Sequence, residues 1–183
     1  MRRLSYAALG LLLAGPALAA AAEPGSYAPW ESRPVSGLSA QQIDDLRAGR
    51  GMALALPAEL NGFPGPRHVL DLAGELALTP EQRGRTEAMF AEMQREAAAL
   101  GDRIVEAEMR LDRLFAGGDP DGEAVRIATG DVARLYGELR FTHLRYHIAM
   151  KRLLGPQQLA AYARLRGYDG GGGRHGDHGH GRH

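Results

Sequence analysis

The chain of 183 residues contains no cysteine. This absence excludes disulfide bonds, thiolate metal sites, a cysteine nucleophile and the lipid-bearing cysteine of a lipoprotein. The sequence also lacks a glycine-rich phosphate loop and an HExxH pattern, and its serines lie mostly in the N-terminal leader. We therefore predict that the protein is not an enzyme.

Neither an excess of one charge nor a strand-like alternation of apolar residues is present. The 22 basic residues are matched by 22 acidic ones and are interleaved with them on the expected helix faces. This pattern is typical of a solvated surface with ion pairs, so we expect no nucleic-acid partner. Without alternating apolar runs of useful length, the sequence favours the all-α class.

The N-terminus has the three parts of a secretory signal peptide. Two arginines precede an apolar run over residues 4–14, and small residues follow as far as residue 22. The run is too short for a good membrane span, so we predict a cleaved signal over residues 1–22, a periplasmic location and no stable membrane span after cleavage. An uncleaved anchor is the alternative. Residues 23–37, rich in serine and proline, are expected to form a flexible leader.

The strongest helix signal runs from Leu78 to Phe115. Thr79 can cap the helix, Pro80 suits its first position, and Gln82 can close the capping box. Apolar or small residues then recur at spacings of four and three for about four heptads, which predicts a long helix packed against another helix. This first seam consists of Thr86, Phe90, Met93, Ala97, Leu100, Ile104, Ala107, Leu111 and Leu114.

A second seam of matching length follows a tight turn at residues 117–120. Asp119 is the expected N-cap and Pro120 the expected first-turn residue. Two seams joined in this way predict a long antiparallel helical hairpin, and its broad apolar faces predict an elongated homodimer. The second seam consists of Val125, Ala128, Val132, Leu135, Leu139, Thr142, Tyr146, Ala149 and Leu153.

Shorter helices are expected on either side of the hairpin. The predicted segments run from Ser39 to Arg47, in part over residues 52–60, from Pro66 to Ala77, and from Pro156 to about Leu165. The helical domain should therefore span residues 38–168. A glycine run then opens a tail rich in glycine and histidine over residues 169–183, which we expect to be disordered.

The two helix-start signals that bracket the hairpin also suggest a family. They are Leu78-Thr79-Pro80-Glu81-Gln82 and Leu154-Gly155-Pro156-Gln157-Gln158, the second having glycine in place of the threonine. Residues 66–168 resemble the periplasmic Spy/CpxP-like proteins with LTxxQ motifs, including their heavy-metal-resistance and metal-sensor branch.

The resemblance implies two alternative functions. One is a stress or resistance protein that senses or buffers divalent heavy-metal ions. The other is an ATP-independent chaperone, a curved helical dimer that holds unfolded proteins. Beyond a second copy of the chain, the implied partners are unfolded periplasmic proteins or an envelope-stress signalling protein.

The tail carries the clearest metal-binding composition. His175, His178, His180 and His183 are four of the seven histidines and lie within the last nine residues. Imidazole is a common ligand of zinc, nickel and copper, and flexible spacing lets several rings meet at one ion. We expect a divalent transition metal ion (zinc, nickel, cobalt or copper) as the cofactor, with a merely polar terminus as the alternative.

Two further groups of potential ligands lie on predicted helices. His143, His147 and Met150 are spaced by four and three and share one helix face, as in the metal-sensing relatives that the chain resembles. His68, Asp71 and Glu75 form a weaker third set. The alternatives are histidines that flank the packing seam and, for the third set, an ordinary hydrated helix face.

Overall fold

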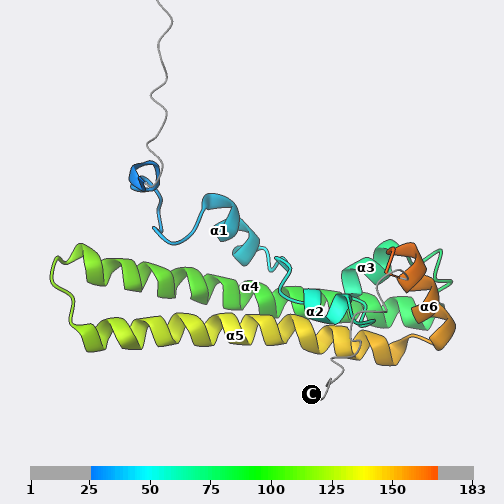
Figure 1. The fold of residues 1–183 in the computed structure, drawn as a ribbon. Helices are drawn as coiled ribbons and strands as arrows, with labels where there is room; N and C mark the ends of the chain where they lie inside the picture. Colours follow the sequence, from blue (N-terminus) through cyan, green and yellow to red (C-terminus); the bar gives the residue numbers. More distant parts are fainter. Residues whose placement is uncertain (1–25, 169–183) are drawn as a thin grey trace, which may run out of the picture. The chain divides into compact units, whose positions relative to one another are not determined.

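The computed structural model describes residues 26–168, and every regular element in that range is helical (Figure 1). Of the described residues, 26–32 belong to a short N-terminal unit with one 3-10 turn, η1 (Ala28–Trp30), and 33–168 form the helical domain. The all-α prediction is therefore confirmed. The expected signal peptide and the histidine-rich tail lie outside the described residues.

A long antiparallel hairpin forms the body of the domain. Its arms, α4 (Pro80–Ala116) and α5 (Gly122–Leu153), lie side by side (Figure 1). Every residue of the two predicted seams is buried or half-buried, and Ile104 and Leu139 are almost fully enclosed. The apolar spacing therefore predicted both the hairpin and its inner faces correctly.

The middle of α4 is covered by the N-terminal part of the domain. Helix α1 (Ala40–Arg47) begins with a complete capping box between Ser39 and Gln42, as predicted. It packs on α4 and shares a core cluster with both arms of the hairpin. Val35, within the expected leader, is 1% exposed and belongs to the same cluster. The expected leader therefore contributes a buried side chain to the domain.

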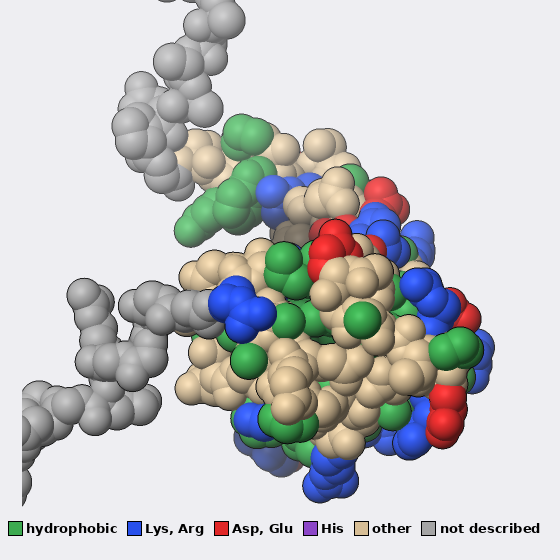
Figure 2. Space-filling view, turned by 90° about the vertical axis from the view of Figure 1, so that its right-hand side faces the viewer, with side chains coloured by type: hydrophobic (Ala, Val, Ile, Leu, Met, Phe, Trp, Pro, Cys, Tyr) green, Lys and Arg blue, Asp and Glu red, His purple; other side chains and the backbone are tan. Residues whose placement is uncertain are grey.

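Three short helices gather near the start of α4 and the end of α5. They are α2 (Leu56–Glu59), α3 (Pro66–Asp71) and α6 (Pro156–Leu165) (Figure 1). A second apolar cluster joins α3 and α6 to the hairpin, consisting of Val69, Leu76, Met150, Leu154 and Tyr162. Seen from this end, Lys and Arg side chains are intermingled with Asp and Glu along one edge (Figure 2). None of the helices between residues 26 and 168 combines the length and apolar composition that a membrane crossing needs.

Two predicted helix boundaries were wrong. The helix that begins at Pro66 ends at Asp71 rather than Ala77, and turns lead from there to Ala77, whose φ is +47°. The N-cap of α5 is Asp121 instead of Asp119. The Asp121 carboxylate accepts hydrogen bonds from the amides of Glu123 and Ala124, so Pro120 precedes the helix instead of opening it.

The two LTxxQ-like motifs, residues 78–82 and 154–158, contact each other through their glutamines. Gln82 and Gln158 donate to each other's side-chain oxygens, both at 2.9 Å. The same oxygens accept the amides of Thr79 and Gly155, and the remaining N–H groups donate to the carbonyls of Leu153 and Leu76. Because Gly155 has no side chain, only half of a capping box forms at the start of α6. The pair nevertheless satisfies both amides and links the starts of α4 and α6.

Replacing either glutamine with alanine should lower the free energy of unfolding by about 1–3 kcal/mol, because partly buried partners lose their hydrogen bonds. The double variant should lose less than the sum of the single losses. Urea denaturation of all four proteins tests this coupling. The exposed neighbour Gln157 provides the control, since its replacement with alanine should change the free energy by about 0.5 kcal/mol at most. Additive losses at Gln82 and Gln158 would show that the two motifs act independently.

Candidate metal site

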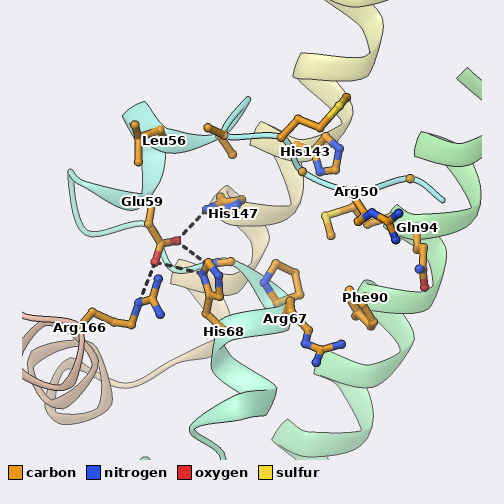
Figure 3. A pocket seen from close by; sticks show the side chains of 18 of the residues that line it. Arg50, Leu56, Glu59, Arg67, His68, Phe90, Gln94, His143, His147 and Arg166 are labelled. Carbon is orange, nitrogen blue, oxygen red and sulfur yellow. Dashed lines mark hydrogen bonds and ion pairs between the residues drawn. The ribbon is translucent and has the colours of Figure 1, made fainter. Parts of the chain in front are cut away.

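A cavity of about 570 Å³ lies where the short helices meet the hairpin (Figure 3). Its walls come from the segment between α1 and α2, from α2 itself, from the start of α3, from both arms of the hairpin and from the segment after α6. His68, His143 and His147 all line it. The fold thus brings one member of the third predicted set to the same cavity as the histidine pair of α5.

His147 is held in a defined orientation by backbone contacts. Its Nδ1 lies 2.7 Å from the carbonyl oxygen of Phe63. Since a carbonyl only accepts, Nδ1 carries the proton, and in the neutral ring Nε2 keeps its lone pair. The close approach of this ring depends on Gly65, because a Cβ atom there would lie 2.9 Å from Nε2. His147 therefore presents an unprotonated nitrogen in a space that a larger residue would fill.

His143 lies one helical turn earlier on α5 and is 2% exposed. Its Nε2 is buried and has no hydrogen-bond partner in the described part of the chain. Burial is the main cause that lowers the pKa of His143, and the nearby His147 is the second. Burial also lowers the pKa of His147, although the Phe63 carbonyl and Glu59 oppose this effect. Both rings are therefore favoured in the neutral form that binds metals.

Glu59 of α2 is a buried carboxylate at the centre of a polar cluster. Its Oε2 accepts the Gly65 amide at 3.1 Å, and its Oε1 accepts the hydroxyls of Tyr162 and, at 3.3 Å, Tyr168. His68 Nδ1 is 3.3 Å from Oε1 in a geometry that does not make a hydrogen bond. Arg166 Nε lies 3.7 Å from the same oxygen and His147 Nδ1 lies 3.6 Å from Oε2 (Figure 3).

These contacts determine the ionisation of the cluster. Burial alone would raise the pKa of Glu59, but contacts with His68 and Tyr162, together with electrostatic attraction to His68 and His147, lower it to about 2. Burial and the Glu59 carboxylate raise the pKa of Tyr162. Glu59 is therefore ionised at neutral pH and its oxygens are already engaged by the chain's own donors.

The other predicted ligands lie elsewhere. Met150 is fully enclosed in the second apolar cluster and does not line the cavity. Asp71 is exposed and pairs with Arg67 at 3.0 Å, and Glu75 is also exposed. His175, His178, His180 and His183 lie outside the described residues. Within residues 26–168, no group of three or more His, Cys, Asp or Glu side chains is arranged to hold a metal ion.

Sequence reasoning missed Glu59 as a member of this site. A signal was available, because Glu59 is the only charged residue in the otherwise apolar run 52–60. A carboxylate in such a run is expected to be either exposed or provided with buried partners. Its partners come from positions up to 109 residues away, which spacing along the chain does not reveal.

The donors at the α5 end of the cavity suit a transition metal ion. His143 offers a buried imidazole nitrogen without a hydrogen-bond partner among the described residues, and His147 is held in the tautomer that leaves Nε2 free to bind a metal. Zinc, nickel, cobalt and copper all bind imidazole nitrogen of this kind. Comparisons with protein-family models, with curated proteins and with solved structures found no match for this chain.

Proposed function

We propose that this protein is a periplasmic metal-binding protein that buffers or senses a divalent transition metal ion such as zinc, nickel, cobalt or copper. His143 and His147 hold the ion through their Nε2 atoms. The observation that carries the proposal is that His143 lines the cavity and that its buried Nε2 has no hydrogen-bond partner among residues 26–168. The signal-peptide pattern and the resemblance of residues 66–168 to periplasmic metal-resistance proteins support the location and the role.

The energetics of burial favour this reading. An unsatisfied buried polar group costs about 1–3 kcal/mol, and a bond to a metal ion removes that cost. The hydrogen bond from His147 to Phe63 fixes the second ring before an ion arrives, so little ordering is needed on binding. Two imidazoles leave coordination positions for water, a reporting partner or further donors.

Calorimetric titration with zinc, nickel, cobalt and copper at pH 7.5 tests the proposal. The protein should be the full chain with His175, His178, His180 and His183 changed to alanine, so that tail histidines do not contribute. We expect one ion per chain and a rise in melting temperature on binding, because the ion binds the folded state. His143→Ala in this background should weaken binding by at least about tenfold, the effect of losing about 1.4 kcal/mol.

Gln94→Ala provides a matched control, because Gln94 lines the same cavity but is exposed and contributes no ligand to the proposed site. It should bind the ion as tightly as the parent protein. Equal metal uptake by the parent protein and His143→Ala, with no change in melting temperature, would remove the cavity as a metal site.

A second candidate function, an ATP-independent chaperone acting as a homodimer, is favoured by an exposed apolar stripe on α5. Ile127, Phe141 and Ile148 are 53%, 63% and 39% exposed and are spaced by multiples of seven residues, which places them on one helix face. Such a face suits a second copy or an unfolded client. Changing all three to serine should abolish suppression of client aggregation if the stripe binds clients. This candidate would be removed if the variant suppressed aggregation as well as the parent protein and if sizing gave a monomeric mass for both proteins.

A further inference from the structure

Two methionines line the cavity together with the histidines. Met52 comes from the segment between α1 and α2 and is half-buried, whereas Met93 comes from α4 and is 7% exposed. Three separate parts of the chain therefore bring thioether and imidazole donors to one space.

Hard oxygen donors are largely unavailable there. Both oxygens of Glu59 already accept hydrogen bonds from the Gly65 amide and the two tyrosine hydroxyls. The chain has no cysteine to supply a thiolate. Apart from the amide oxygen of Gln94, the side-chain donors that remain include neutral imidazole nitrogen and thioether sulfur. Soft sulfur ligands of this kind select monovalent copper over the harder divalent ions.

The backbone at Met52 is unusual for a residue with a side chain. Met52 and Ala53 have φ values of +40° and +58°, in the left-handed region that glycine normally occupies. Strain of this kind is commonly found at ligand-binding segments. Here it occurs in the segment that brings a thioether to the cavity, between Gly51 and α2.

We propose that this cavity binds copper in its monovalent state, Cu(I), through His143 and the thioethers of Met52 and Met93. The inference rests on the proposed function, since it uses the same cavity and one of the same histidines. It adds the identity and oxidation state of the ion and two ligands from outside α5. Met150 has no part in this site, because it is enclosed in the apolar cluster.

The test uses the full chain with the four tail histidines changed to alanine. Cu(I) is supplied anaerobically with ascorbate, and its affinity is measured by competition with bicinchoninate. Met52→Leu and Met93→Leu should each weaken Cu(I) binding by at least tenfold, and the double variant should weaken it further. Zinc affinity, measured on the same variants, should stay within about twofold of the parent value, because the usual protein ligands of zinc are Cys, His, Asp and Glu side chains and not the Met thioether.

Leucine replaces methionine at similar volume, so these variants should fold, as circular dichroism would verify. Met150→Leu is the matched control and should bind Cu(I) like the parent protein. In X-ray absorption spectra of the copper-loaded parent, copper–sulfur scattering should be present, and it should be lost in the double variant.

The outcomes separate this inference from the proposed function. Cu(I) binding that depends on His143 but is unaffected at both methionines would overturn the inference and leave a histidine metal site. Cu(I) binding that requires the methionines, with no divalent ion bound, would support the inference and overturn the divalent form of the proposed function. Absence of both kinds of binding would overturn both.

Discussion

Replacing Gly101 with alanine should lower the free energy of unfolding by about 3 kcal/mol, the upper end of the usual cost of overpacking. A Cβ atom at this position would lie 2.0 Å from the carbonyl oxygen of Leu46 and 2.4 Å from its carbonyl carbon. Because the contact is with backbone, no side chain can rotate away, and α1 must shift from α4. Chemical denaturation followed by circular dichroism measures the loss.

Gly130 provides the control for Gly101. It lies inside α5, and a Cβ atom there would meet nothing within 4 Å. Alanine at position 130 should therefore stabilise the protein by up to about 1 kcal/mol through its higher helix propensity. The two substitutions are chemically identical, so opposite signs identify the close contact as the cause. A similar gain at both positions would mean that α1 does not pack against Gly101.

Replacing Glu59 with alanine should cost about 3–5 kcal/mol, the usual effect of removing one partner from a buried charged cluster. The Gly65 amide and the Tyr162 hydroxyl lose their acceptor, and the charge of Arg166 loses a nearby partner. The loss should appear as a lower midpoint in urea denaturation. Glu75→Ala removes an exposed carboxylate of the same type and should change stability by about 0.5 kcal/mol at most. Equal small effects at positions 59 and 75 would contradict the buried cluster.

Glu59 also predicts a specific acid sensitivity. Its pKa falls from 4.5 to about 2 on folding, so the unfolded chain takes up the proton first as the pH decreases. The stabilisation of about 3 kcal/mol is present above pH 4.5 and is lost as the pH falls through the folded pKa. Glu59→Gln cannot ionise at this position. Between pH 5 and pH 2 its free energy of unfolding should therefore fall less than that of the parent protein, and parallel pH profiles would contradict this prediction.

Much of the fold could be predicted because its determinants are local. The Thr79 and Ser39 caps and the hairpin seams are repeated patterns within a few residues of each other. The boundary errors have local causes too. Either Asp119 or Asp121 could cap α5, and only the observed hydrogen bonds decide between them. The helix that begins at Pro66 ends at Asp71, and the next residue is Leu72 instead of a glycine. The sequence at this point therefore did not predict the early end of the helix.

The candidate site was predictable only in part. The spacing of His143 and His147 placed them on one face, and their burial followed from the adjoining seam. The cavity depends instead on contacts between residues far apart in sequence, such as Phe63 with His147 and Glu59 with Tyr162. No periodic pattern records such contacts. The same reason explains why Met93 was expected only as a seam residue, although it also lines the cavity.

The hairpin is unevenly supported along its length. From residue 108 to residue 134, which includes the turn between the arms, every side chain is exposed or half-buried. The fully enclosed side chains of α4 come before residue 108 and those of α5 come after residue 134, where the arms contact α1 and line the cavity. Opening of the turn and its flanking helix ends therefore exposes little apolar surface and costs little free energy. In hydrogen exchange, we expect these amides to form a rapidly exchanging group that opens independently of the cavity, so the distal end of the hairpin can change its shape while the side chains that line the cavity keep their arrangement.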